Sequence, residues 1–350
     1  MICLSGTGLD ARALARIAGG ETVTLDPAAL DRVTENRKVI QRILEEGRTV
    51  YGINTGFGQF ATVVIPPEQL AQLQLNLVRS HAAGVGEALP QDQTRALMAA
   101  RINCLLKAHS GIRKEPILLL TECLNRGVLP VIPSQGSVGA SGDLAPLAHM
   151  ALLLVGEGEA WQGTAVIPGG QALAQAGLGP ITLEAKEGLA LINGTQLITA
   201  IGNLAVARLM DLVPLADEIA ALSLEALQGT RAAFDPRIHL ARPHPGQIQV
   251  AAHMRDILGA SSEISESHRD CHRVQDAYSL RCLPQVHGVA RDALGFCQGI
   301  LERELNSATD NPMIFTDTQE SRSGGNFHGQ YPAFACDMLA IAACDLASIS

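Results

Sequence analysis

The sequence feature that most constrains the fold is a long stretch of helical apolar spacing between residues 183 and 228. Only Asn193-Gly194 and Pro214 interrupt it, and its alanines and leucines favour a helix. Helices this long and apolar are normally buried against other helices or other subunits. Composition agrees, because 47% of the residues are hydrophobic but only 3% are aromatic. We therefore predict a mainly α protein.

Start and stop signals predict several helices before this stretch. A proline just after a capping side chain marks a helix start, and a glycine marks an end. These signals predict helices that run from Asp26-Pro27 to Gly47, that begin at Pro66-Pro67, and that run from Pro90 to Gly111. Residues 144–155 are apolar enough for a buried helix, with Asp143 as its N-cap.

Glycine and proline separate the remaining elements. Residues 156–182 are rich in both and predict a surface hairpin or loop. Helical spacing returns at residues 247–259 and 284–305, residues 311–329 form a loop, and a last helix starts near Pro332. We predict an N-terminal domain over residues 1–182 and a bundle of long helices over residues 183–350. Because the last helix has no stop signal, we expect the natural chain to continue beyond Ser350.

The charge balance argues against a nucleic-acid partner. The formal net charge is -9, whereas phosphate binding requires a basic surface. Residues 1–20 lack the basic and apolar regions of a secretion signal, and no window reaches the ~20 uninterrupted apolar residues of a membrane span. We therefore expect a cytoplasmic protein without a membrane partner.

The run from Gly136 to Asp143 (GSVGASGD) is too rich in small residues to be a regular element and predicts a tight loop. It lacks the Lys and spacing of a phosphate-binding loop, the GxGxxG of a dinucleotide fold and the GxSxG of a hydrolase elbow. For an isolated Ala-Ser-Gly tripeptide, a turn before a helix is the commonest role. The surrounding sequence therefore has to decide what this loop does.

The wider run from Gly136 to Met150 (GSVGASGDLAPLAHM) closely resembles the signature of the histidine and aromatic amino acid ammonia-lyases. The resemblance extends from Thr49 to the last residue, and its further motifs are YGINTGFG at 51–58, EGLALINGTQ at 187–196, VQDAYSLRC at 274–282, NSATDNP at 306–312 and SGGNFHG at 323–329. It implies the fumarase- and aspartase-like helical bundle of that family, with a smaller N-terminal domain that carries the reactive loop.

In this family an Ala-Ser-Gly tripeptide cyclises to a 4-methylideneimidazol-5-one (MIO), which the resemblance assigns to Ala140, Ser141 and Gly142. A planar amide nitrogen is a poor nucleophile and must be forced close to the carbonyl two residues back. Gly142 tolerates that crowding because it lacks Cβ, and Ser141 can lose water to leave the methylidene. No external cofactor is expected.

The resemblance also assigns aromatic side chains to the site. Tyr51 is the base that takes the β proton of the substrate, Tyr278 lies near the MIO and the amino group, and Phe327 shields the ring. Tyr51 could instead be a core aromatic. The chain has only three tyrosines, however, and one that lies in a glycine-rich loop is better suited to catalysis than to filling a core.

Polar side chains complete the site that the resemblance implies. Arg281 presents a planar fork for the substrate carboxylate, and Asn193 and Gln275 contact the MIO or the carboxylate. An isolated Arg is more often a solvated surface charge, and a buried amide more often satisfies backbone groups. These three roles therefore depend on the family match.

Substrate choice is predicted from Ser80-His81. The matching pair in the aromatic amino acid lyases is typically Phe-Leu or His-Leu, whereas Ser-His resembles the histidine enzymes. A His in the pocket can hydrogen-bond an imidazole, and leaving it unpaired against phenylalanine would be costly. On the other interpretation, His81 is a helix-surface residue.

We therefore expect conversion of L-histidine to trans-urocanate and ammonia. The resemblance implies a homotetramer whose active sites draw residues from three subunits. Two alternatives stay open: a lyase or 2,3-aminomutase for an aromatic amino acid, and a catalytically impaired scaffold of the same fold. Because His268, Cys271 and His272 have no second cluster at ligand spacing, they predict a polar loop and no metal.

Overall fold

The computed structural model describes residues 1–56, 62–136, 139–260, 262, 266, 270 and 272–349. The chain divides into two compact units, of which the first contains Met1–Leu204 and Leu301–Ala333 and the second contains Ala205–Ile300 and Phe334–Ser350. The domain division after residue 182 stays a prediction.

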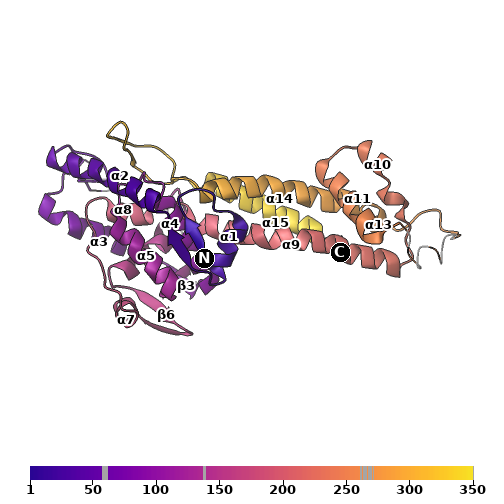
Figure 1. The fold of residues 1–350 in the computed structure, drawn as a ribbon, viewed down its shortest axis with the longest axis horizontal. Coiled ribbons are helices and arrows are strands. Elements are labelled where there is room, and N and C mark those ends of the chain that lie inside the picture. The colour runs from indigo at the N-terminus through magenta and orange to yellow at the C-terminus, as the bar shows by residue number, and fades with distance from the viewer. Residues whose placement is uncertain are drawn as a thin grey trace. The chain divides into compact units, whose positions relative to one another are not determined.

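Helices form most of the regular secondary structure of the first unit, as the indigo and magenta ribbons of Figure 1 show. They are α1 (Ala11–Ala18), α2 (Pro27–Glu45), the 3-10 helix η2 (Pro67–Gln69), α3 (Leu70–His81), α4 (Gln91–Leu105), α5 (Lys114–Arg126), α6 (Leu144–Leu154), α7 (Gly169–Gln175), α8 (Glu187–Ile192) and the start of α9 (Gln196–Ala226). The predicted mainly α class is confirmed.

The strands of the first unit are short and form small sheets. β1 (Ile2–Leu4) pairs in parallel with β2 (Val23–Leu25), and β3 (Val85–Ala88) pairs antiparallel with β5 (Pro133–Gln135). β4 (Leu129–Pro130), β6 (Glu159–Gln162) and β7 (Ala165–Pro168) form an antiparallel sheet in that order. β8 (Met313–Phe315) and β9 (Glu320–Arg322) form a hairpin inside the segment predicted to be a loop. The hairpin predicted within residues 156–182 is β6–β7, followed by α7.

Helix α4 lies in the core of the first unit. All residues from Ala96 to Leu105 are buried, which is why this helix has no polar face. Helices α1 and α5 contact it, and α3, α6 and α8 contact one another. These contacts fix the ends of α3 and α8 that line the site described below.

The second unit is also helical. It contains the rest of α9, the 3-10 helix η3 (Arg231–Phe234), α10 (Pro236–Leu240), α11 (Pro245–Leu258), α13 (Tyr278–Arg281), most of α14 (Leu283–Leu305) and most of α15 (Gln330–Ala347). Its core includes Leu224, Val250, Met254 and Leu283. Pro214 was expected to interrupt the long helix but lies inside α9. The proline removes one backbone hydrogen bond without ending the helix, because tertiary packing supplies most helical stability.

Local sequence signals predicted the start of α2 correctly but predicted the end of α4 too late. Asp26 caps α2 by accepting from Ala28 N at 3.1 Å, as predicted. The helix that begins after Pro90 ends at Leu105 and not at Gly111. Tight turns follow it, in which Lys107 N donates to Cys104 O and Ala108 adopts a φ of 58°.

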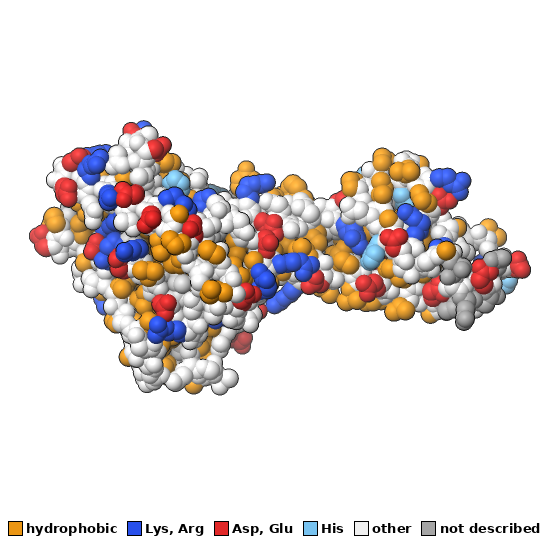
Figure 2. Space-filling view, in the orientation of Figure 1, with side chains coloured by type: hydrophobic (Ala, Val, Ile, Leu, Met, Phe, Trp, Pro, Cys, Tyr) orange, Lys and Arg blue, Asp and Glu red, His pale blue; other side chains and the backbone are white. Residues whose placement is uncertain are grey.

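The stretch Glu187–Ala226 is long and apolar enough to cross a membrane by length and composition alone. Core helices of water-soluble proteins pass the same test, so this is weak evidence. On the face shown in Figure 2, basic and acidic side chains are interspersed over the described residues. That face therefore does not present the single basic field that phosphate binding requires.

Candidate active site

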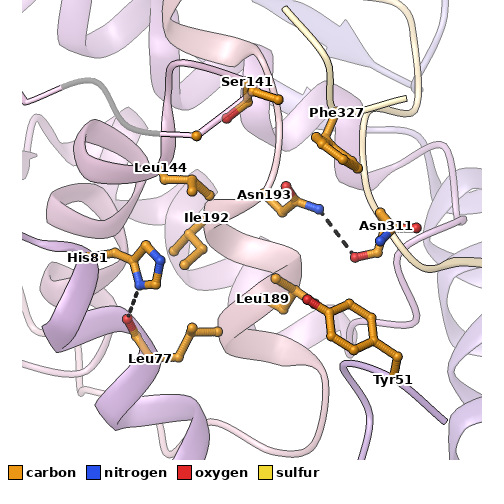
Figure 3. Close-up of a pocket in the computed structure, with 12 residues that line it drawn as sticks. Tyr51, Leu77, His81, Ser141, Leu144, Leu189, Ile192, Asn193, Asn311 and Phe327 are labelled. Carbon is orange, nitrogen blue, oxygen red and sulfur yellow. Dashed lines mark hydrogen bonds between the residues drawn. The ribbon is translucent and has the colours of Figure 1, made fainter. Parts of the chain in front are cut away.

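A cavity of about 280 Å³ in the first unit brings together six of the predicted site residues (Figure 3). Its walls come from the end of α3, the turn before α6, helix α8 and the segment that follows Asp310. The lining residues are Tyr51, Leu77, His81, Gly139, Ala140, Ser141, Leu144, Leu189, Ile192, Asn193, Asn311 and Phe327.

The predicted reactive tripeptide lies in a tight turn at the wall of this cavity. Gly142 N donates to Gly139 O at 3.2 Å, and both glycines have a φ of 79°, which favours glycine. The side chain of Ser141 is buried, and its Oγ accepts from Asp143 N at 3.2 Å. The turn therefore presents Ala140 and Ser141 to the cavity. Ser137 and Val138 of the same motif lie outside the described residues.

A second segment holds the turn from the other side. Gly329 N donates to Ala140 O at 2.9 Å. A Cβ built on Gly329 would lie 2.7 Å from Ser141 O, so only glycine permits this close approach of the two backbones. The SGGNFHG motif thus contributes the Phe327 ring and a backbone contact to the reactive turn.

Asp143 does not cap α6 through its side chain, contrary to the sequence prediction. Its Oδ2 instead accepts from Leu197 N at 2.7 Å and Ile198 N at 3.1 Å, in the first turn of α9. Burial raises the pKa of Asp143 to about 7, although these two backbone hydrogen bonds lower it. The carboxyl group therefore connects the reactive turn to the start of α9.

His81 faces the cavity from the C-terminal end of α3 (Figure 3). Its Nδ1 lies 2.9 Å from Leu77 O. A carbonyl oxygen only accepts, so Nδ1 carries the proton in this hydrogen bond and Nε2 of the neutral ring is an acceptor. Ser80 does not line the cavity, and its hydroxyl donates to the same carbonyl at 2.9 Å.

Asn193 ends α8 and is held by a buried polar network. Its Nδ2 donates to Asp310 Oδ1 and to Asn311 O, both at 3.2 Å. Figure 3 shows the amide oxygen on the side that faces Ser141. Behind it, Lys186 Nζ lies 2.6 Å from Asp310 Oδ2, and both side chains are closed to solvent. Because Asp310 and Asn311 accept from Nδ2, this network leaves the amide oxygen of Asn193 facing the Ala140-Ser141 turn.

Tyr51 and Phe327 supply the aromatic walls of the cavity. Tyr51 lies across the view from His81 in Figure 3. Its neighbour Gly52 has a φ of 75°, and a Cβ there would lie 2.7 Å from Leu189 Cδ2. Glycine therefore lets the tyrosine loop pack directly on α8. Phe57 and Gly58 of this motif lie outside the described residues.

Three predicted site residues belong to the second unit and do not line this cavity. Gln275 is exposed, and Tyr278 is 70% exposed. Arg281 Nε donates to Asp276 O at 2.8 Å, a backbone contact that leaves the other guanidinium nitrogens for a further partner. Their predicted roles stay predictions.

Sequence reasoning missed part of the site. Leu77, Leu144, Leu189 and Ile192 line the cavity but carry no chemical signal of their own. Asp310 lies inside the NSATDNP motif, but the motif alone did not predict its contact with Asn193.

The part of the chain that the structure describes contains no group of three His, Cys, Asp or Glu side chains suited to a metal ion. His268 and Cys271 are outside it, and the absence of a metal stays a prediction.

Comparison with known proteins gives consistent matches. A model of the aromatic amino acid lyase family matches residues 9–350. Histidine ammonia-lyase of Anaeromyxobacter dehalogenans is 55% identical over 341 residues, which cover 95% of this chain and 67% of the relative. The crystal structure of histidine ammonia-lyase from Trypanosoma cruzi matches with a TM-score of 0.90 at 45% identity, covering 99% of this chain and 65% of that one. The phenylalanine aminomutase of Pantoea agglomerans matches with a TM-score of 0.95 at 34% identity, covering 100% and 71%. The chain thus spans about two thirds of the length of these relatives.

Proposed function

The chain belongs to the aromatic amino acid lyase family, and we propose that the protein converts L-histidine to trans-urocanate and ammonia. The observation that carries this proposal is that one cavity is lined by both the Ala140-Ser141 turn and His81. The identity to histidine ammonia-lyases supports the same substrate.

We propose that Ala140, Ser141 and Gly142 form an MIO group. The turn fits that group, because the Gly142 nitrogen already folds back within it and the buried Ser141 leaves little room for a larger side chain. When formed, the group supplies an electrophile for the substrate amino group. No external cofactor is part of the proposal.

The remaining cavity residues bind the substrate and move its proton. His81 Nε2 accepts a hydrogen bond from an imidazole N–H, because Nδ1 is held by Leu77 O. Tyr51 Oη takes the β proton. This proton is too weakly acidic for a side chain alone, so its removal also depends on the electrophile that the MIO group would supply. Asn193 offers its amide oxygen toward the turn, and the Phe327 ring helps to exclude water from the cavity.

We also propose a homotetramer in which Gln275, Tyr278 and Arg281 act in the active sites of neighbouring subunits. Each lies in the second unit, where Tyr278 is largely exposed in the single chain. The same unit exposes apolar side chains along α9 that assembly would cover: Leu212, Leu215, Ile219 and Leu222. Arg281 would then bind the substrate carboxylate with its free guanidinium edge. A cytoplasmic location stays part of this proposal.

A lyase or 2,3-aminomutase for an aromatic amino acid is the second candidate. It is favoured by the apolar part of the cavity wall, which Leu77, Leu144, Leu189 and Ile192 provide. A catalytically impaired scaffold of the same fold is the third candidate.

A substrate panel tests the proposal. We expect kcat/KM for L-histidine to exceed that for L-phenylalanine and L-tyrosine, with urocanate as the product by its ultraviolet absorbance. The Ser141→Ala variant is the matched control and should lose activity while it keeps its helical circular dichroism. Equal kcat/KM for histidine and phenylalanine would support the second candidate, and no turnover of any substrate would support the third.

A further inference from the structure

The hydrogen bond between Gly329 and Ala140 joins the reactive turn to a segment almost two hundred residues later in the sequence. Gly329 is buried, and its N–H donates to the Ala140 carbonyl oxygen at 2.9 Å. Gly329 O accepts from Ala333 N in the first turn of α15, which fixes the direction of the Gly329 peptide. The donor is therefore held in place before any chemistry occurs.

We infer that the Gly329 N–H is the oxyanion donor for formation of the MIO ring in this chain. This inference rests on the proposed function, because it concerns how the Ala140-Ser141-Gly142 segment matures. The Ala140 carbonyl is the group that the Gly142 nitrogen must attack, and its oxygen is the atom that Gly329 contacts. No other part of the proposal assigns Gly329 a role.

The step that Gly329 assists is the first of two losses of water. The Gly142 nitrogen forms a bond to the Ala140 carbonyl carbon, and the π electron pair of the carbonyl moves to oxygen. That oxygen takes the Gly142 amide proton and leaves as water with the Ser141 amide proton, which creates a C=N bond. The second water consists of the Ser141 hydroxyl and its Cα hydrogen, and its loss leaves the methylidene.

Negative charge grows on the Ala140 oxygen only during the first step. A fixed N–H donor stabilises such charge best when it lies about 2.7 to 3.1 Å from the position of the oxyanion. The carbonyl oxygen that becomes this oxyanion already lies 2.9 Å from the Gly329 nitrogen before the reaction. The close approach also explains why residue 329 is glycine, since a Cβ would lie 2.7 Å from Ser141 O and 3.6 Å from Ala140 O. The donor and its lack of a side chain thus serve the same reaction.

A backbone ester at position 329 tests the inference most directly. Glycolic acid in place of Gly329, introduced during cell-free translation, removes the N–H and adds no bulk. Samples quenched over time and measured by intact mass report the fraction of chains that have lost two waters. Removal of one oxyanion donor slows such reactions by about 10²- to 10³-fold, so we expect the ester chain to keep its full mass long after the wild type has matured.

One variant tests the close approach at position 329, and a second controls for general damage to the segment. Gly329→Ala keeps the N–H but adds the clashing Cβ, and it should also slow maturation. Gly325→Ala is the matched control, because nothing lies within 4 Å of a Cβ at that position, and it should mature like the wild type. Circular dichroism and the Tm of each chain confirm that it has folded.

The outcomes distinguish this inference from its premise. A folded ester chain that matures as fast as the wild type overturns the inference and leaves the proposed function intact. A wild-type chain that keeps its full mass overturns the proposed function and the inference with it. A folded ester chain that stays at full mass while the wild type loses two waters supports both.

Discussion

Breaking the ion pair between Lys186 and Asp310 should destabilise the first unit in a pH-dependent way. The two charged atoms lie 2.6 Å apart, and both side chains are 0% exposed. Burial lowers the pKa of Lys186, Asp310 raises it again in part, and Arg101 and Arg37 lower it further. In Asp310→Asn the counter-charge is gone while both arginines remain. Lys186 should then give up its proton when the chain folds.

The cost of that proton loss can be worked out from the reference pKa. Lys186 titrates near 10.5 when unfolded, and each unit between that value and the working pH costs about 1.4 kcal/mol. At pH 7 the variant should lose about 5 kcal/mol, the upper end of the range of about 3 to 5 kcal/mol for removal of one partner of a buried pair. Because only its unfolded state then binds the proton, the variant should regain about 1.4 kcal/mol per unit between pH 7 and pH 9 relative to the wild type.

Urea denaturation at pH 7, 8 and 9 measures this difference. Lys38→Met is the matched control, because Lys38 also pairs with a carboxylate at 2.6 Å but is 58% exposed. It should change the free energy of unfolding by less than about 1 kcal/mol at every pH. If the destabilisation by Asp310→Asn is equal at pH 7 and pH 9, the reasoning is refuted, because Asp310 then does not decide whether Lys186 keeps its proton on folding.

Three further changes have defined outcomes. Burial raises the pKa of Asp143 from 3.8 to about 7. The free energy of unfolding of the wild type should therefore fall by up to about 4 kcal/mol as pH rises from about 4 to about 7. Urea titrations of Asp143→Asn should lack that slope, and parallel pH profiles for the two chains would contradict this prediction. His81→Leu should lower the ratio of kcat/KM for histidine to that for phenylalanine by about 5- to 150-fold, the worth of one buried hydrogen bond, and an unchanged ratio would show that His81 does not select the substrate. Gly188→Ala places a Cβ 2.7 Å from Gln74 O, whereas the Cβ of the control variant Gly179→Ala has no atom within 4 Å. Overpacking should lower the free energy of unfolding of Gly188→Ala by about 1 to 3 kcal/mol and lower its Tm. Equal Tm values for the two variants would contradict this prediction.

The sequence predicted well what local signals determine. Helix α2 begins at Pro27 after Asp26, because proline and the capping carboxylate act within a few residues. The same reasoning was wrong for Asp143, whose carboxyl group bonds to the first turn of α9 more than fifty residues later. A capping residue has a local partner and a remote partner available, and only the folded chain shows which one it takes.

Part of the cavity lining was predictable as a set of residues but not as an arrangement. Tyr51, His81, Ser141, Asn193 and Phe327 were each assigned to the site by resemblance, and the fold brings all five to one cavity. The buried pair behind Asn193 was not foreseen, because nothing local distinguishes Lys186 from a surface lysine. Burial of a charge is decided by packing, and packing depends on residues throughout the unit.

The segment that contains residues 301–333 makes its contacts at the centre of this site although it comes late in the sequence. Asp310 holds the Asn193 amide, and Gly329 holds the Ala140 carbonyl. Their partners Asn193 and Ala140 belong to the part of the same unit before residue 204, so neither hydrogen bond can form until residues 301–333 are present. If ring formation needs the Gly329 donor, the Ala140-Ser141-Gly142 turn stays chemically inert until that segment docks. On that inference, the order of the sequence delays formation of the electrophile until the walls of the cavity are complete.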